Sequence, residues 1–235
     1  MRFIHASDLH IDSPLRGLDR YDGAPVERLR SATRTALERL VDRALAERVD
    51  LLLLAGDIYD RDWQDFHTGL FFRGQMVRLE RAGIRCFIVQ GNHDAQGVIS
   101  RQLTLPSNVT VFSSRAAQTV KLDDLSVAIH GRSFPEREVN EDLVPSYPPP
   151  VSGYFNIGLL HTSLTGRAGH DTYAPTDLPT LVAKGYDYWA LGHVHAREVL
   201  NERPRIVFCG NLQGRHAKET GVKGCELVTV EAGRI

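Results

Sequence analysis

The sequence has little of what marks several classes of protein, and each scarcity excludes one class. Its three cysteines, Cys86, Cys209 and Cys225, lie in apolar runs without a CxxC spacing, which predicts reduced, buried thiols rather than disulfides or thiolate metal ligands. No apolar run approaches the length of a membrane span, and the N-terminal MRFIHASD lacks the basic and apolar regions of a signal peptide. We therefore expect a protein of the cytoplasm that does not associate with a membrane.

An excess of charge of one sign is also absent. The 28 basic and 29 acidic residues leave a formal net charge of −1, so net charge does not indicate a polyanionic partner. Lysine is scarce, because 24 of the 28 basic residues are arginine; arginine suits bidentate phosphate contacts, but a compositional bias explains the same count. With 42% hydrophobic and 24% charged residues the chain resembles ordinary globular proteins, and we expect one domain over residues 1–235.

The first part of the chain alternates strands and helices. An apolar strand is expected at residues 2–7 and a fully buried one at 50–55, and the helical spacing of apolar residues predicts a helix over 26–48 between them. A second helix, over 64–82, leads into a strand at 85–90. Two β-α-β units of this kind predict parallel strands.

The second part of the chain is richer in strands and has one more expected helix, over 177–184. The proline-rich segment 144–153 is predicted to be a surface connection without helix or sheet. The sequence thus predicts an α/β fold in which two mixed β-sheets pack face to face with helices on the outside. The short strands expected after Val109 cover residues 110–112, 119–122, 126–130, 156–161, 186–191, 206–209 and 226–230.

Polar clusters follow five of the expected apolar strands. Because strand ends in α/β proteins gather at one rim of a sheet, these side chains are expected to share a site. In an extended chain the alternate residues of DLH, and those of HVH, point the same way, and the glycines at 56, 91 and 192 allow sharp turns. Carboxylate, amide and imidazole groups without thiolate suit Mn, Fe or Zn. The clusters are DLH at 8–10, GDIYD at 56–60, GNHD at 91–94, the single His161 and GHVH at 192–195.

Each cluster alone has a structural explanation, as a turn or as a histidine bonded to a backbone carbonyl. In their order and spacing, however, the five resemble the signatures of the calcineurin-like metallophosphoesterase superfamily. The stretches DLHIDSPLRGL, HTSLTGRAGHDTYAP, GYDYWALGHVHAREVL and CGNLQGRH are similar to the SbcD-type DNA repair exonucleases within it. The resemblance extends from Met1 to about Val230 and implies a four-layer αββα sandwich.

The resemblance also implies a centre of two divalent metal ions, Mn²⁺ in first place with Fe or Zn as alternatives. Asp57 would bridge both ions, and a hydroxide held between them would attack phosphorus. The first ion would be bound by Asp8, His10 and His195, and the second by Asn92, His161 and His193.

Two further residues are implied to act on the leaving group. His93 matches the family's catalytic histidine, which is not a metal ligand and would act as general acid. Asp60 stands where other phosphoesterases of the superfamily carry a carboxylate that orients this histidine, although the archaeal and eukaryotic nucleases typically have histidine there.

Other polar residues have two interpretations. Five polar residues outside the proposed metal centre, named at the end of this paragraph, could contact substrate phosphate or stack on a base. Packing within loops explains these residues equally well. His5, His67 and His130 have no partner spacing and are predicted to be structural or surface histidines. The five residues are His170, Tyr173, Asn211, Arg215 and His216.

The leading hypothesis for function is a Mn-dependent nuclease that acts on DNA phosphodiesters, as the resemblance implies. The same ligands would serve a metallophosphatase or a cyclic nucleotide phosphodiesterase, and a non-catalytic scaffold is a third class. Relatives carry a DNA-capping region and a segment that engages an SMC-like ATPase, and they dimerise. Neither region has room after the final VEAGRI, so the chain is expected to be a truncated form or a minimal catalytic domain, with a homodimer left open.

Overall fold

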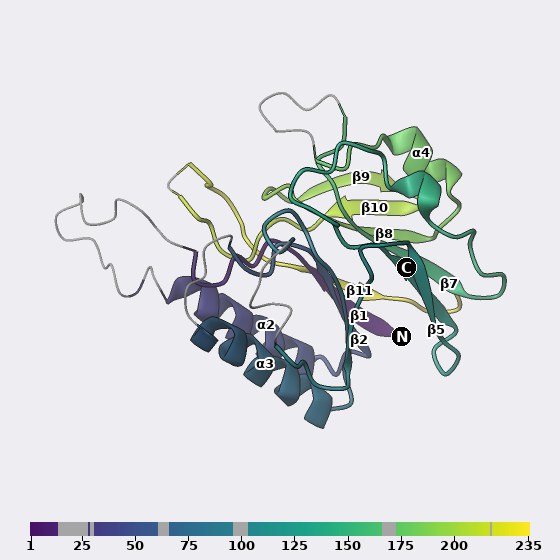
Figure 1. The fold of residues 1–235 in the computed structure, drawn as a ribbon. Coiled ribbons are helices and arrows are strands. Elements are labelled where there is room, and N and C mark those ends of the chain that lie inside the picture. The colour runs from purple at the N-terminus through teal and green to yellow at the C-terminus, as the bar shows by residue number, and fades with distance from the viewer. Residues whose placement is uncertain (14–27, 29–30, 61–65, 96–102, 166–172, 217) are drawn as a thin grey trace.

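Two β-sheets lie face to face in the computed structural model, which describes residues 1–13, 28, 31–60, 66–95, 103–165, 173–216 and 218–235 (Figure 1). The first sheet has the strand order β11-β1-β2-β3-β4, in which the four N-terminal strands are parallel and β11 runs antiparallel to β1. Its strands are β1 (Arg2–Ala6), β2 (Leu51–Ala55), β3 (Arg85–Val89), β4 (Val109–Val111) and β11 (Glu226–Thr229).

The second sheet has the order β5-β6-β7-β8-β10-β9, with four parallel central strands and an antiparallel strand at each edge. Both sheets are therefore mixed, as the sequence predicts. The strands are β5 (Gln118–Leu122), β6 (Val127–Gly131), β7 (Phe155–His161), β8 (Tyr188–Gly192), β9 (Glu198–Glu202) and β10 (Arg205–Phe208).

Helices cover the outer faces of both sheets. Helices α2 (Ala32–Ala46) and α3 (Phe66–Arg81) pack against the first sheet, and the short α4 (Leu178–Ala183) and the 3₁₀ turn η2 (Val144–Ser146) lie by the second (Figure 1). None of the helices in the described ranges has the length and apolar character needed to cross a bilayer.

The run LLLLA of β2 shows how the sequence sets these layers. Successive strand residues point to opposite faces of a sheet. Leu51 and Leu53 therefore enter the core between the two sheets, while Leu52 and Leu54 pack beneath α2 and α3. All of β2 is buried. A strand buried on both faces has to be a continuous apolar run.

Helix α2 has its buried residues at the spacing of one helical face: Thr33, Leu37, Leu40, Val41 and Ala44. The expected fold class is confirmed. The predicted helices are confirmed from residues 32 and 66 onward, and the expected starts at 26 and 64 lie outside the described residues.

Two local predictions were wrong. Strand β9 was not expected, because its sequence EVLNE is polar and its residues are exposed or half-buried at the sheet edge. Segment 144–153 is more than a surface connection, since it begins with a 3₁₀ turn and buries Val144 and Tyr147. The Tyr147 hydroxyl donates to the carbonyl of Leu159 over 2.8 Å, which ties this segment to β7.

His5 links the two sheets in the core and carries an expected pH effect on stability. Its Nε2 donates to the Leu191 carbonyl over 3.2 Å, and its Nδ1 lies 3.0 Å from the Tyr188 hydroxyl. Burial lowers the pKa of His5 to about 4, whereas an unfolded histidine titrates near 6.5. The unfolded chain therefore binds the proton first as pH falls from 6.5 to 4, and folding should lose about 3 kcal/mol over that window.

The measurement is urea unfolding of wild type and His5→Gln between pH 7.5 and pH 4. The pH slope of the wild-type unfolding free energy should exceed that of the variant, with His67→Gln, an exposed histidine of α3, as control. Equal slopes for all three proteins would contradict this account.

Candidate metal centre

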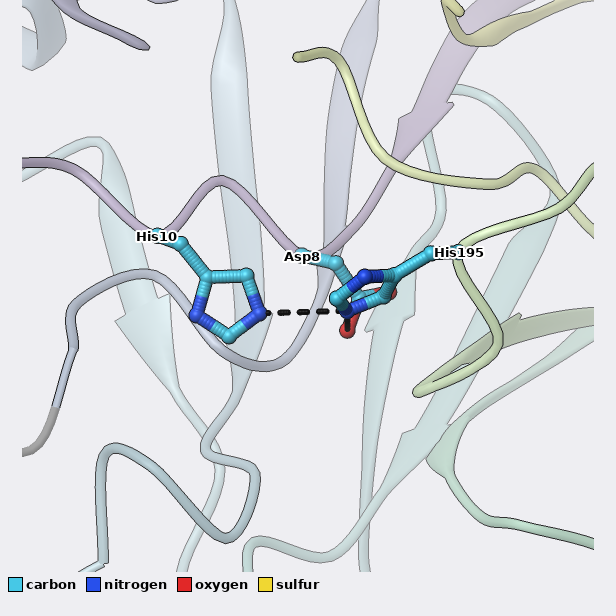
Figure 2. A group of neighbouring side chains, drawn as sticks. All are labelled: Asp8, His10 and His195. Carbon is cyan, nitrogen blue, oxygen red and sulfur yellow. Dashed lines mark hydrogen bonds and ion pairs between the residues drawn. The ribbon is translucent and has the colours of Figure 1, made fainter. Parts of the chain in front are cut away.

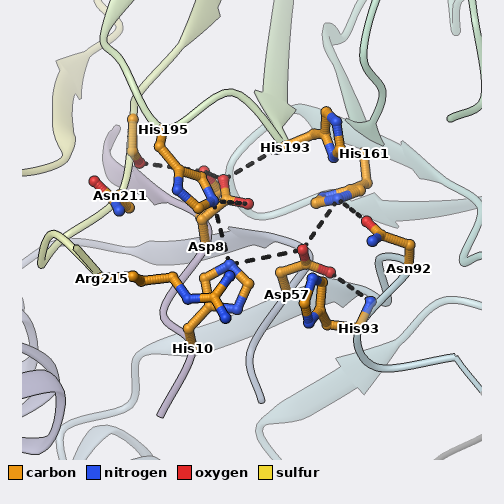
Figure 3. Close-up of polar contacts among 12 residues, drawn as sticks. Asp8, His10, Asp57, Asn92, His93, His161, His193, His195, Asn211 and Arg215 are labelled. Atoms are coloured by element: carbon orange, nitrogen blue, oxygen red, sulfur yellow. Dashed lines mark hydrogen bonds and ion pairs between the residues drawn. The ribbon is translucent and has the colours of Figure 1, made fainter. Parts of the chain in front are cut away.

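The five polar clusters of the sequence meet at one rim of the sandwich (Figure 3). DLH, GDIYD and GNHD follow β1, β2 and β3 of the first sheet, whereas His161 ends β7 and GHVH closes β8 of the second. Parallel strands bring their carboxyl ends to the same edge. The seven predicted metal ligands therefore lie together, although they come from two sheets.

The first group of potential ligands contains Asp8, His10 and His195, whose ligand atoms lie within 4.8 Å of one another. In Figure 2 the rings of His10 and His195 point a nitrogen toward each other. These two Nε2 atoms lie 3.2 Å apart. His195 Nε2 is 3.6 Å from Asp8 Oδ1. Three ligand atoms of this kind around one point could hold a divalent cation.

The second group contains Asp57, His161 and His193, again within 4.8 Å of one another. His161 Nε2 lies 3.5 Å from Asp57 Oδ2 and 3.0 Å from the Asn92 side-chain oxygen. Its Nδ1 donates to the Ala55 carbonyl over 2.8 Å. That bond selects the tautomer whose Nε2 carries a free lone pair, as a metal-binding histidine requires.

Asp57 connects the two groups. Its Oδ2 is 3.8 Å from His10 Nε2 and 3.5 Å from His161 Nε2, so this oxygen stands between them. Its other oxygen, Oδ1, accepts the backbone N–H of His93 over 2.9 Å. The carboxylate thus has the position expected of a ligand shared by two ions.

The electrostatics of the rim fit cations. Asp57 is buried, and burial together with the nearby charges of Asp8 and Asp94 holds its pKa well above the usual range. Burial and the positive charge of Arg215 hold the pKa of His10 well below its usual range. Asp8 Oδ1 is buried without a hydrogen-bond partner. Divalent cations would satisfy these groups, and a donor set of carboxylate, amide and imidazole suits Mn, Fe or Zn.

The backbone at the ligands differs from the extended chain that the sequence suggested. Asp8, His10 and Asp57 have φ of 53°, 42° and 53°, and His193 has φ of 100°. These left-handed values are unfavourable for residues other than glycine and tend to persist at functional sites. Backbone bonds hold the turn, since the N–H groups of Asp8 and His10 donate to the carbonyls of Gly56 and Asp57, each over 3.0 Å.

The expectation that the two histidines of HVH share a face was also wrong. His195 joins the first group and His193 joins the second, so the pair divides between the two groups. The positive φ of His193 turns its side chain away from the direction that a continuing strand would give. His195 therefore lies with Asp8 and His10, and His193 lies with Asp57 and His161.

The reason why glycine is needed differs among the three positions beside the ligands. Gly56 has φ of +92°, which confirms the expected turn. Gly91 and Gly192 are instead required by close packing, because a Cβ at Gly91 would lie 2.8 Å from His161 Nε2 and closer still to Asp57 Oδ1, and one at Gly192 would overlap the Ala55 carbonyl.

Gly91→Ala should therefore weaken metal binding by about 10 to 100-fold, the range seen when residues that orient ligands are changed. Isothermal titration with Mn²⁺ measures it. The matched control is Gly74→Ala in α3, where a Cβ meets nothing within 4 Å and helix propensity favours alanine by up to about 1 kcal/mol. Equal Mn²⁺ affinity in both variants would contradict the steric argument.

His93 and Asp60 form a pair at the edge of the two groups. His93 Nδ1 donates to Asp60 Oδ1 over 2.6 Å, and the second carboxylate oxygen accepts the Ser13 hydroxyl over 2.6 Å and is ion-paired with Arg215. Although burial alone would raise the pKa of Asp60, the bonds from His93 and Ser13 and the charge of Arg215 hold it well below the usual range. The carboxylate is therefore ionised and fixed against the histidine ring.

Sequence reasoning missed several residues that hold this site. Asp94 accepts the backbone N–H groups of Ile58, Tyr59 and Gly91, and its place in GNHD was a signal that could have found it. Glu219 accepts from His195 Nδ1 over 2.8 Å, and no sequence pattern marks it. Burial opposes ionisation of Glu219, but its bonds to His195, Arg215 and Asn211 lower its pKa to about 2.

The predicted substrate residues have varied positions. Tyr173 is half-buried with its ring 5.4 Å from that of His193, and Asn211 is buried and donates to Glu219. Arg215 pairs with Asp60, while the His216 side chain is 60% exposed and 3.3 Å from Glu219. His170 lies outside the described residues.

An open groove of ≈ 610 Å³ leads to the site. Asp57, His93, His193, His195 and Tyr173 line it. Three cationic residues also line it: Arg215, Lys218 and Lys223. A groove lined by acids, imidazoles and cations together suits an anionic ester that is held by metal ions.

Comparison with known families agrees with this site. The family model described as calcineurin-like phosphoesterase matches residues 1–197. The chain therefore belongs to the calcineurin-like phosphoesterases, a family of metallophosphoesterases, as the five clusters predict.

Individual relatives can be named beside it. The chain is 39% identical to the uncharacterized metallophosphoesterase YhaO of Bacillus subtilis over 100% of this chain and 59% of that protein. It is 23% identical to the SbcD subunit of the nuclease SbcCD of Escherichia coli over 100% of this chain and 66% of that protein. The chain thus spans less than two thirds of both relatives. The crystal structure of a dimetal phosphatase from Danio rerio has the same fold, with a TM-score of 0.51 and 12% identity over 90% of this chain and 88% of that one.

Proposed function

We propose that this protein is a two-metal phosphodiesterase that cleaves DNA. The observation that carries the proposal is the position of Asp57 Oδ2, within 3.8 Å of His10 Nε2 in one ligand group and 3.5 Å of His161 Nε2 in the other. One carboxylate between two sets of ligands is the arrangement that a pair of cations needs. When bound, such cations supply Lewis-acid chemistry, which withdraws charge from phosphate oxygens and makes water nucleophilic at neutral pH.

The chain's own residues would handle the leaving group. Asp60 accepts from His93 Nδ1, which leaves Nε2 as the ring nitrogen that can hold a proton for the leaving group, and His93 lines the groove. As the new bond from the water oxygen to phosphorus forms and the ester P–O bond breaks, the departing alkoxide would take that proton. General-acid catalysis of this kind contributes typically about 10² to 10⁴-fold.

Two features support a nucleic acid over a small ester. The groove is open rather than enclosed, and Lys218 and Lys223 line it, so a chain of phosphates could lie along it. The sequence is also similar to a protein that is named a nuclease. The same resemblance makes an SMC-like ATPase the proposed partner, Mn²⁺ the proposed metal, and residues 1–235 one catalytic domain.

A substrate panel tests the proposal. The purified chain, with Mn²⁺ and separately with Fe²⁺ or Zn²⁺, is given bis(4-nitrophenyl) phosphate, 4-nitrophenyl phosphate, cyclic nucleotides, and single- and double-stranded DNA. Mn²⁺-dependent cleavage of the diester and of DNA, abolished by EDTA, is the expected result. Turnover of the monoester alone would identify a phosphatase, and turnover of cyclic nucleotides alone a cyclic nucleotide phosphodiesterase. No turnover of any substrate would favour the scaffold, and each of these three outcomes overturns the proposal.

A further inference from the structure

The loop after β10 carries a cation, Arg215, that contacts the carboxylate to which His93 is bonded. Arg215 lies in this loop, and its Nη2 forms an ion pair with Asp60 Oδ2. Its Nε donates to the Ser13 hydroxyl over 3.2 Å, and that hydroxyl donates to the same carboxylate oxygen over 2.6 Å. Arg215 and Ser13 therefore hold one oxygen of Asp60 between them.

The other oxygen of Asp60 is the one that holds His93. Oδ1 accepts from His93 Nδ1 over 2.6 Å, so Arg215, Asp60 and His93 form a continuous line of charge-assisted bonds. Without Arg215, the Asp60 carboxylate could rotate about its side-chain bonds and still accept from Ser13. The planar guanidinium of Arg215 contacts both Asp60 and Ser13 and so fixes the plane of the carboxylate. A flexible lysine would do this less well.

Arg215 is itself held in place. Its backbone N–H donates to Glu219 Oε2 over 2.9 Å, and Asn211 donates to the same oxygen over 2.8 Å. The second oxygen of Glu219 accepts from His195 Nδ1 over 2.8 Å. The loop is thus anchored through Glu219 to a residue of the first ligand group and through Arg215 to Asp60.

We propose that Arg215 is a positioning residue, which orients the ring of His93 through Asp60 so that Nε2 faces the leaving oxygen. This inference rests on the proposed function of His93 as general acid. The alternative for Arg215 is a direct contact with substrate phosphate. The two roles differ in one respect: a proton donor matters most for a strongly basic leaving group, whereas a phosphate contact acts on every leaving group alike.

The experiment compares two thymidine diesters that differ in the leaving group. Thymidine 5′-(4-nitrophenyl) phosphate releases a weakly basic nitrophenolate, and the dinucleotide TpT releases a strongly basic sugar alkoxide. Arg215→Met should lower kcat on TpT by about 10 to 100-fold, the range for residues that orient a functional group, with little change on the nitrophenyl ester and in KM. Arg215→Lys should recover part of the loss, and Mn²⁺ content should stay unchanged in both.

Three further variants serve as references. His93→Ala should show the same preference for loss on TpT, and the double variant with Arg215→Met should lose little more than His93→Ala alone, because the two residues act through one interaction. Arg85→Met is the matched control, because Arg85 pairs with Asp124 at the start of β3, where the strand begins rather than where it meets the site. It should leave both substrates unchanged.

A spectroscopic readout on the metal-free protein is independent of turnover. The strongly hydrogen-bonded Nδ1 proton of His93 should give a low-field proton signal in ¹⁵N-histidine-labelled wild type, which is absent from His93→Ala and shifted or broadened in Arg215→Met. Equal loss on both diesters, or an unchanged proton signal, would overturn the positioning role. If His93→Ala itself loses both diesters equally, the general-acid function fails, and the proton signal still tests whether Arg215 orients the ring.

Discussion

Replacing Asp57 with asparagine should abolish the binding of both proposed metal ions and reduce the proposed phosphodiesterase activity by several orders of magnitude. A neutral amide offers one acceptor oxygen and no charge in place of the carboxylate that stands between the two ligand groups, and metal ions contribute several kcal/mol of transition-state stabilisation. The amide oxygen can still accept the His93 N–H, so the local fold should survive. Metal content after dialysis and kcat/KM on bis(4-nitrophenyl) phosphate measure the two effects.

The same substitution should raise the melting temperature of the metal-free protein. Burial and the nearby Asp8 and Asp94 disfavour the ionised form of Asp57, as its raised pKa indicates. Because the folded pKa lies above that of the unfolded chain, the ionised carboxylate costs stability above about pH 4, and asparagine removes that cost. In a protein of this size about 1 kcal/mol corresponds to 2–4 °C.

Asp124→Asn, at an exposed ion pair with Arg85, is the control and should keep both metal content and activity. Retention of two metal ions per chain by Asp57→Asn would show that this carboxylate is not the shared ligand.

His93→Ala should differ from Asp57→Asn in its metal content. We expect the metal content to be preserved and the turnover on DNA to be lowered by about 10² to 10⁴-fold. The imidazole is 18% exposed and its Nδ1 bonds Asp60, and in the proposed mechanism His93 donates a proton rather than binding an ion. Metal analysis and single-turnover cleavage of double-stranded DNA measure the two quantities separately.

The control for this variant is His67→Ala, an exposed histidine of α3, which should retain full activity. If His93→Ala instead loses metal in proportion to activity, His93 is a ligand and the roles of His93 and Asp57 need to be exchanged.

Much of this site can be predicted from the sequence because its signals are local. An apolar run that is buried on both faces, such as LLLLA, identifies a central strand, and a polar group directly after it has to appear at the rim of the sheet. Five such clusters locate the candidate ligands without coordinates. The helices can be predicted equally well, because the buried residues of α2 recur at a spacing of three and four residues.

The rest depends on contacts between distant parts of the chain. Arg215 contacts Asp60, which lies 155 positions away in the sequence, and Glu219 contacts His195 from a loop. No regular spacing of residues in the sequence predicts either contact. The left-handed backbone of Asp8 and His10 is imposed by bonds to residues 56 and 57, which the sequence of DLH alone does not reveal. Strand β9 escaped prediction because an exposed edge strand needs few apolar residues.

The division of the ligands between two sheets has a mechanical consequence. Asp8 and Asp57 extend from one sheet, and His161 and His195 from the other. Each ion held among them would therefore have ligands from both sheets and would link the two sheets to each other. Any ion that binds only the folded chain stabilises it, by about 2.7 kcal/mol at a concentration 100-fold above its Kd. Removal of the metal ions would therefore lower the free energy of unfolding, by weakening the contact between the two sheets, and would also stop the proposed reaction.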